Sequence, residues 1–495
     1  MNRRQFLQNS LLTSLIYSAG ALPRFINESS AAFQPLGSKK MLLNLFMNGA
    51  PDMRHIIVPE YSANTADFGY HYWRNRTRSH GIGNAPSSMQ NHWNDNFNHH
   101  NSGDQYRSHS AVNFGIAKSC GWLSQMWEQG NVAIICNAYG IDSRAHDHAT
   151  LVMNQGNRTS QTGQLNRSGW GGRLAVAGNG SASGNAIGLT NIPSRFCFGP
   201  DGTNINSVNN SNLVSVADSR RIGLREAELS RNARFPWTQD IASRSAKAYY
   251  KTLQSELPND SIYQRFLEHE SKLREFGSLL NERLATVPIP ARIQALYDND
   301  ILNNSNLLNS TYFGRQIRNA FDTIASHDLL DAKVMSMEYG GWDSHEGQAE
   351  QVGSQFEDLF GVDKGFSALW QALVNDVGGV NANRGNLVIL TAGEFGRQIR
   401  DNGGNGTDHG EGNVMLLIGE KVTGGVYGEM FPDGEIDRIQ DASINTPEIT
   451  GLTHIDRHFG EVCNWVTPGS ASTVFPQRNS SDLENGVSFN NLIQT

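Results

Sequence analysis

The stretch Asn386-Leu-Val-Ile-Leu-Thr-Ala-Gly-Glu394-Phe-Gly-Arg397 decides the fold, because it joins an apolar run of strand length to a polar loop. After a segment rich in glycine and asparagine, the chain reaches Thr407-Asp408-His409-Gly410 and enters a second apolar run, Val414-Met-Leu-Leu-Ile418. α/β enzymes place their chemistry in loops at strand ends in this way. We therefore expect strands at 386–390 and 414–418, with a candidate active site in the loop between them.

Three further apolar runs are also followed by polar residues. They are 41–47, which leads to Asp52, 131–137, which leads to Ser143 and Arg144, and 333–338, which leads to Asp343 and His345. Helical patterns lie at about 122–129, 243–291, 314–326, 349–374 and 453–466. The repetition of strand, polar strand end and helix predicts a mainly parallel central sheet with helices on both faces.

The chain has 495 residues, and the strand pattern favours one α/β domain over 41–495. This domain carries two expected insertions: a surface loop rich in asparagine and histidine at about 61–110, and a helical segment at about 243–330. Forty Lys and Arg residues against 48 Asp and Glu give a formal charge of -8. The balance argues against nucleic-acid binding, which needs a basic face.

The N-terminus carries an expected export signal over 1–21, followed by a linker over 22–40. Arg3-Arg4-Gln5-Phe6-Leu7, a short apolar stretch and Ala19-Gly20-Ala21 resemble a twin-arginine signal with cleavage near Ala21. The usual serine before the arginines and lysine after the leucine are absent, and an ordinary secretory signal or a frayed helix is the alternative. We expect a periplasmic or secreted protein whose partner during export is the twin-arginine translocase.

No other segment approaches the roughly 18 apolar residues of a membrane-spanning helix, so no stable membrane span is expected. The four cysteines, Cys120, Cys136, Cys197 and Cys463, form no CxxC pair, which argues against a sulfur-ligated zinc site. An oxidising compartment would permit one or two disulfides, although Cys136 lies in an apolar run typical of a buried strand.

Five polar clusters follow the predicted strands: Asp52, Ser143 with Arg144, Asp343 with His345, Glu394 with Arg397, and Asp408 with His409. Each has a structural alternative, since Asp52 could end a turn and Ser143 could cap a helix. Together, however, carboxylates and imidazoles at one sheet edge are the ligands of a dinuclear metal site.

The motifs Gly-Gly-Trp-Asp343-Ser-His345, Gly-Glu394-Phe-Gly-Arg397, and Thr-Asp408-His409-Gly followed by an apolar strand and Gly-Gly-Val-Tyr-Gly resemble the DUF1501 family of exported bacterial proteins. The first-strand Gly-x-x-Asp and the Ser-Arg-x-His segment also fit, so the resemblance extends over nearly the whole chain. It implies the fold of the alkaline phosphatase and sulfatase superfamily.

The resemblance also implies roles for individual residues. Ser143 takes the place of the nucleophile, Arg144 and Arg397 hold the anionic ester oxygens, and the expected metal ligands are Asp52, Asp343, His345, Asp408, His409 and, as a weaker choice, His454. Asp456 and His458 compete with His454 for that last position. The superfamily's Asp-x-x-x-His is Asp-x-His here, which changes how the pair can reach a metal.

We therefore expect a metal-dependent hydrolase of phosphate or sulfate esters acting on a small molecule or glycan. It would use two divalent ions, zinc first, with calcium, magnesium or manganese as alternatives. A catalytically inactive binding or surface-assembly protein on the same fold is the alternative.

Overall fold

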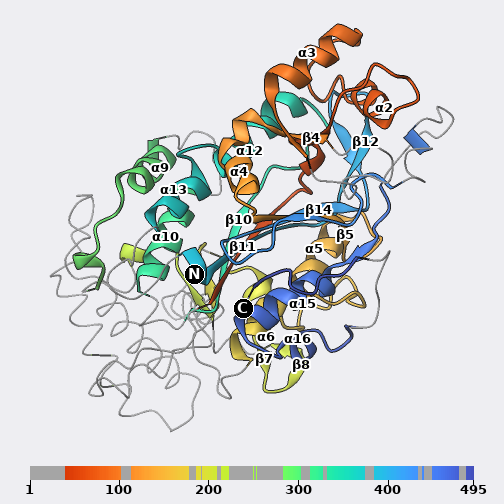
Figure 1. Cartoon of the computed structure of the whole chain (residues 1–495). Helices are drawn as coiled ribbons and strands as arrows, with labels where there is room; N and C mark the ends of the chain where they lie inside the picture. Colours follow the sequence, from red (N-terminus) through yellow and green to blue (C-terminus); the bar gives the residue numbers. More distant parts are fainter. Residues whose placement is uncertain are drawn as a thin grey trace, which may run out of the picture.

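A nine-stranded mixed sheet forms the centre of the part of the chain that the structure describes (Figure 1). In this computed structural model the strands run in the order β15-β5-β14-β11-β1-β10-β6-β9, and β16 pairs with β5. Their bounds are β1 Met41–Met47, β5 Val132–Tyr139, β6 Ala186–Gly188, β9 Leu213–Ser215, β10 Val334–Tyr339, β11 Leu387–Gly393, β14 Asn413–Ile418, β15 Gly425–Tyr427 and β16 Thr453–His454.

The described residues are 40–101, 113–177, 186–190, 192–208, 213–221, 249, 252, 283–302, 313–326, 332–373, 384–432, 438–439, 449–478 and 487–494. The expected signal over 1–21, almost all of the linker over 22–40, and most of 243–291 lie outside them. No helix within the described ranges combines the length and apolar character that a membrane span requires. All four cysteines are buried free thiols.

One strand makes the sheet mixed. β1 is parallel to β10 and β11, as the sequence predicts, but β14 is antiparallel to both β11 and β5. The reason lies in the connection from β11 to β14. The chain leaves β11 into a hairpin of β12 (Arg397–Asp401) and β13 (Thr407–His409) and returns directly beside β11 without a crossover helix.

The central strand β1 is buried on both faces of the sheet. Met41, Leu43, Leu45 and Met47 belong to one hydrophobic cluster, whereas Leu42 and Phe46 belong to the cluster on the other face. This alternation follows from the period of two in a strand. A continuous apolar run such as 41–47 is therefore the pattern of a strand covered by helices on both sides.

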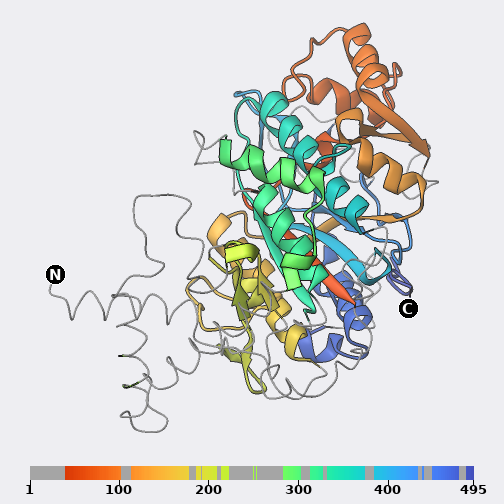
Figure 2. The same ribbon diagram turned by 90° about the vertical axis from the view of Figure 1, so that its left-hand side faces the viewer.

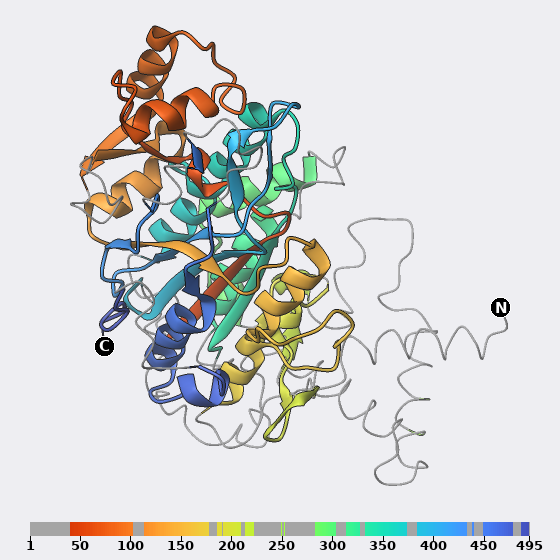
Figure 3. The ribbon, with the colours of Figure 1, turned by 90° about the vertical axis from the view of Figure 1, so that its right-hand side faces the viewer.

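Helices cover both faces of the sheet (Figures 2 and 3). On one side lie α4 Gly121–Glu128, α9 Ala291–Leu302, α10 Phe313–Ala325, α12 Gln348–Phe360 and α13 Gly365–Ala372. On the other lie α5 His146–Gln155, α6 Trp170–Val176, α15 Ile455–Val466 and α16 Ala471–Val474. Because α10 packs on β10 and contributes Ile317 and Phe321 to the core, it is part of this layer.

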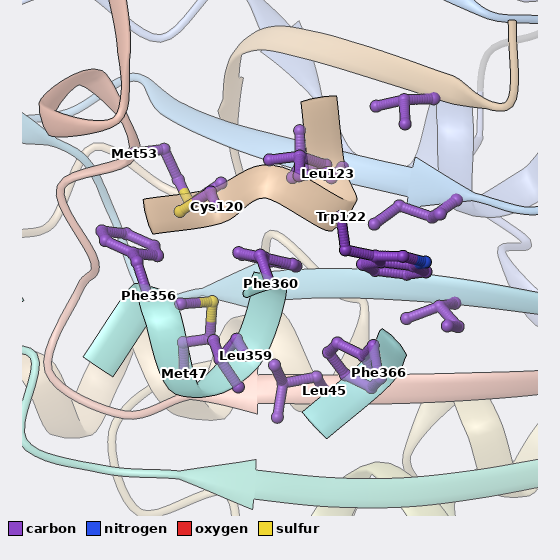
Figure 4. Packing of buried hydrophobic residues seen from close by; sticks show 14 of the residues in the cluster. Leu45, Met47, Met53, Cys120, Trp122, Leu123, Phe356, Leu359, Phe360 and Phe366 are labelled. Atoms are coloured by element: carbon purple, nitrogen blue, oxygen red, sulfur yellow. The ribbon is translucent and has the colours of Figure 1, made fainter. Parts of the chain in front are cut away.

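The first side is closely packed with aromatic and aliphatic side chains. Figure 4 shows Leu45 and Met47 of β1 near Leu359 of α12 and Phe366 of α13. The sequence predicts one helix over 349–374, but a turn divides it, because the chain takes a positive φ of 59° at Asp363. At Gly365 a Cβ would lie 2.5 Å from the Phe313 ring, so this glycine permits the close approach of α13 to α10.

The segment 61–110, expected as an irregular loop, contains regular structure in its described part up to 101. It holds α2 Phe68–Asn75, α3 Pro86–Asn96 and β3 Phe97–Asn101, and β3 forms a three-stranded sheet with β2 Ile57–Pro59 and β4 Asn113–Ala117. Trp73, Trp93 and Phe97 form its core. These anchors are too sparse among polar residues to produce a visible periodicity, which explains the difference from the expectation.

Candidate metal centre

Loops from three parallel strands meet at one edge of the large sheet. β10 leads to Asp343 and His345, and β11 leads to Glu394 and Arg397. β5 has the same direction as β11, since β14 is antiparallel to both, and it leads to α5, which begins at His146. The carboxyl ends of these strands therefore point the same way, which is where open α/β sheets bind ligands.

Asp343 lies at the centre of three histidines. Its Oδ1 atom is 3.0 Å from Nε2 of His345 and 3.0 Å from Nε2 of His409, and its Oδ2 atom is 3.4 Å from Nε2 of His146. The Nε2 atoms of His345 and His409 are 3.0 Å apart. Donor atoms of His146, Asp343 and His409 all lie within 4.8 Å of one another, a spacing that suits the ligands of one metal ion.

The Nδ1 atom of each histidine faces a group that can only accept a hydrogen bond. The pairs are His345 with Asp408 Oδ1 at 2.9 Å, His409 with the Arg144 carbonyl at 3.1 Å, and His146 with Glu394 Oε1 at 3.6 Å. With the proton on Nδ1, the tautomer that such acceptors favour, the lone pair of each Nε2 is directed toward Asp343. Three lone pairs and a carboxylate thus converge, which a divalent cation would stabilise.

The surroundings of Asp343, Asp408 and His409 favour ionised carboxylates and a neutral ring, as metal binding requires, whereas Glu394 raises the pKa of His146. The hydrogen bond from Arg397 outweighs burial and holds the pKa of Asp343 below its usual range. Burial lowers the pKa of His409, which favours the neutral ring. The hydrogen bond from Asn402 is the main reason that the pKa of Asp408 is lowered. The side chains of Asp343 and His345 are 45% and 40% exposed, so a ligand can reach them from solvent.

Glu394 and Arg397 hold the loops around this cluster. The Glu394 carboxylate accepts the amide hydrogens of Gly49 and Ala50. Gly49 has a φ of 112°, and a Cβ there would lie 2.5 Å from the amide nitrogen of Asp343, so only glycine allows the turn after β1 to come this close.

The structure differs from the expected role of Arg397 as an ester-binding residue. Its guanidinium is buried and donates to Asp343 Oδ1 at 2.6 Å. The other donors reach backbone carbonyls, those of Gly49, Ala50, Trp342 and Thr407. All of its nitrogens are therefore engaged within the protein, and Arg397 orients Asp343.

Asp52 lies apart from the histidine cluster, in contrast to its expected place among the metal ligands. It is buried in an ion pair with Arg76, and it accepts a hydrogen bond of 2.7 Å from Gln348 Nε2. Arg76 outweighs the effect of burial, so the pKa of Asp52 is lowered. The sequence did not suggest this pairing, because Arg76 lies 24 residues away in the segment expected to be a loop.

The remaining predicted site residues fall at different distances from the cluster. Asp408 contacts His345 and so reaches the cluster through that ring. Arg144 is exposed at its rim, and its Nη1 is 3.4 Å from the His409 carbonyl. Ser143 does not cap α5, whose N-cap is Ala145; its Oγ accepts a hydrogen bond from the Ala145 amide. His454 contacts Tyr139, with its Nε2 atom 2.8 Å from the phenol oxygen.

His146 is the member of the cluster that the sequence analysis did not select. It occupies the last position of the Ser-Arg-x-His segment, at the start of α5, where the backbone turns its ring toward Asp343. The sequence could have indicated His146, because it lies three residues after Ser143 and follows the same predicted strand. The local pattern alone resembles an ordinary helix start, however.

Comparison with known proteins finds a family match, and it covers most residues of this cluster. No curated protein matches the chain. Residues 294–445 match the family described as "Protein of unknown function (DUF1501)", and they include Asp343, His345, Glu394, Arg397 and His409. This match supports the assignment of the chain to the DUF1501 family that its motifs predict.

Proposed function

We propose that the protein is an exported metal-dependent hydrolase of phosphate or sulfate esters, built on an alkaline phosphatase-like fold. One observation carries the proposal: three histidine Nε2 atoms converge on the Asp343 carboxylate while the Nδ1 atom of each ring faces an acceptor. Hydrogen-bond acceptors that face one another in this way repel unless a cation lies between them. Imidazole nitrogens and a carboxylate are ligand types that zinc prefers.

The ligand set in this proposal is His146, Asp343, His345 and His409. Asp408 and Glu394 would orient two of the rings, as acceptors next to metal-bound histidines do. This differs from a site with two ions and Asp52 as a ligand, because Asp52 is engaged by Arg76, while His146, Asp343 and His409 share one centre and His345 contacts Asp343. A divalent ion held there would supply Lewis-acid chemistry toward an ester oxygen.

Residues of the chain supply the other functions of a hydrolase in this proposal. Arg144 is exposed beside the cluster, and its planar guanidinium suits a tetrahedral phosphate or sulfate group. Ser143, three residues before His146, is the proposed nucleophile; its hydroxyl accepts a hydrogen bond from the Ala145 amide, and a metal or a base would have to activate it. Asp343 and His345 are accessible to solvent, and the proposed substrate is a small-molecule or glycan ester.

The experiment that tests the proposal begins with the metal content of the purified mature protein. We expect about one zinc per chain, and hydrolysis of p-nitrophenyl phosphate or p-nitrophenyl sulfate that a chelator abolishes and added zinc restores. A protein that binds zinc but hydrolyses neither ester would favour the alternative of an inactive binding or surface-assembly protein. Absence of metal binding would exclude the proposed centre.

A further inference from the structure

We propose that Gln348 is a positioning residue that fixes the two ligand-bearing loops of the candidate metal centre relative to each other. The inference rests on the proposed function, because it concerns the same centre. Gln348 is the first residue of α12 and is fully buried. It does not contact Asp343, His146, His345 or His409 in any hydrogen bond that the structure describes.

The amide of Gln348 joins both loops through one oxygen atom. Its Oε1 accepts hydrogen bonds from Ser344 Oγ at 3.2 Å and from Thr407 Oγ1 at 2.8 Å. Ser344 lies between Asp343 and His345, and Thr407 lies two residues before His409. One side-chain oxygen therefore holds Ser344, which lies between two ligands, and Thr407, which lies close to a third. The Thr407 amide also donates to the Ser344 carbonyl at 3.2 Å.

The other end of the amide is fixed by a buried ion pair. Gln348 Nε2 donates to Asp52 Oδ2, whose carboxylate is held by Arg76. Arg76 in turn donates to the Gln398 carbonyl on β12, next to Arg397. Because Asp52 can only accept, it sets the orientation of the amide and directs Oε1 toward the two hydroxyls.

The amide is the chemical group that this place requires. It must donate to a carboxylate on one side and accept from two hydroxyls on the other, and glutamine does both without charge. A methionine of similar length would fill the space but make none of these hydrogen bonds. A glutamate would place a second carboxylate against Asp52.

The test measures the zinc dissociation constant of the mature protein by competition with a chromogenic chelator, at a temperature where every variant is folded by circular dichroism. We expect Gln348→Met to weaken zinc binding about tenfold, as loss of an outer contact of a metal site does. Thr407→Val is nearly isosteric and removes one donor to Oε1, so it should weaken binding by a smaller factor. Thr407→Val also tests the inference if Gln348→Met does not fold.

A double-mutant cycle separates positioning from general loss of stability. If both residues act through one hydrogen bond, Gln348→Met with Thr407→Val should weaken zinc binding no more than Gln348→Met alone. The matched control is Asp322→Asn, since Asp322 on α10 is also fully buried in an ion pair, with Arg220. It should lower stability and leave zinc affinity unchanged.

The outcomes distinguish this inference from the proposed function. His409→Ala should abolish zinc binding; if the wild-type protein and His409→Ala bind zinc equally, or neither binds it, the proposed centre itself is overturned. If His409→Ala loses zinc but Gln348→Met binds it like the wild type, only the positioning role fails. Equal weakening by Gln348→Met and Asp322→Asn would also overturn that role, because it would reflect stability alone.

Discussion

Nδ1 of His345 lies 2.9 Å from Oδ1 of Asp408, and this contact turns Nε2 of the same ring toward Asp343. The residue pair therefore has two different functions, although the sequence suggests two equivalent metal ligands. Asp408 is itself held by Asn402, whose amide nitrogen is 3.0 Å from Oδ1. Oδ1 of Asp408 therefore contacts both Asn402 and His345. Asp408 affects the cluster through the His345 ring.

Asp408→Asn should weaken zinc binding about tenfold without abolishing it, because the ring loses its acceptor while every direct ligand remains. His345→Ala should have a larger effect, since it removes a ligand. Isothermal titration with zinc measures both. Asp201→Asn, an exposed change on β7, is the control for loss of one negative charge. Complete loss of binding in Asp408→Asn would identify Asp408 as a direct ligand.

Glu394→Gln tests the second carboxylate that faces a ring. Glu394 raises the pKa of His146 and accepts the amides of Gly49 and Ala50, so it links His146 to the turn after β1. The glutamine side chain keeps one accepting oxygen but loses the charge. We expect zinc affinity to fall about tenfold, together with a loss of thermal stability. Unchanged affinity with lower stability would restrict Glu394 to its role in the turn.

The strands were predictable because burial on both faces leaves uninterrupted apolar runs. The sequence predicts β1 at the bounds that the structure gives, and it predicts β5, β10, β11 and β14 to within a few residues. The direction of β14 was not predictable, since an apolar run does not show which way it lies in a sheet. That information is in the β12–β13 hairpin, whose polar residues resemble any surface loop.

The site was predictable only as far as strand ends bring residues together. Asp343, His345 and His409 follow predicted strands and meet in the structure. The environment of Asp52 could not be read in the same way, because it depends on Arg76 from a segment without visible periodicity. Distant pairing of this kind, and the selection of His146 over other histidines, are set by tertiary packing.

Buried histidines should make the protein sensitive to acid. His458 is fully buried, neither ring nitrogen has a hydrogen-bond partner among the described residues, and burial with nearby Arg478 lowers its pKa to about 3. The unfolded chain, with a histidine pKa near 6.5, takes up this proton first. Stability from His458 is therefore complete above about pH 6.5 and falls as the pH decreases toward 3.

His458→Leu should remove this part of the pH dependence. Between pH 7 and pH 5 the wild-type free energy of unfolding should fall by about 2 kcal/mol more than that of the variant. The reason is that His458 takes up a proton in this pH range only when the chain unfolds. Urea denaturation at the two pH values measures the difference. His55, whose pKa burial lowers to about 4, leaves a residual slope in both proteins. Parallel pH curves would contradict the prediction.

Export is tested with the full-length chain in a bacterial host that has a twin-arginine translocase. Arg3→Lys with Arg4→Lys should retain the protein in the cytoplasm, because the translocase requires the paired arginines of its signal. Cell fractionation and immunoblotting measure the distribution. Arg24→Lys, just after the predicted cleavage site, is the matched control and should be exported normally. Export of the twin-lysine variant at the wild-type level would indicate an ordinary secretory signal.

His146→Ala and Asp52→Asn together determine which residue completes the ligand set. His146 is half-buried and contributes Nε2 directly to the cluster, so His146→Ala should weaken zinc binding at least 100-fold with little change in stability. Asp52→Asn leaves Arg76 charged and without its carboxylate in the interior, which should cost about 3 to 5 kcal/mol of stability.

His146→Ala should therefore lower zinc affinity, whereas Asp52→Asn should mainly lower stability. Under conditions where the variant is folded, Asp52→Asn should bind zinc within about tenfold of the wild type. We expect this small loss of affinity because Asp52 orients Gln348. Urea denaturation and zinc titration of both variants separate the two properties. If Asp52→Asn lost zinc binding entirely and His146→Ala retained it, the first-strand aspartate would be the ligand. The ion pair with Arg76 would then have to open when the metal binds.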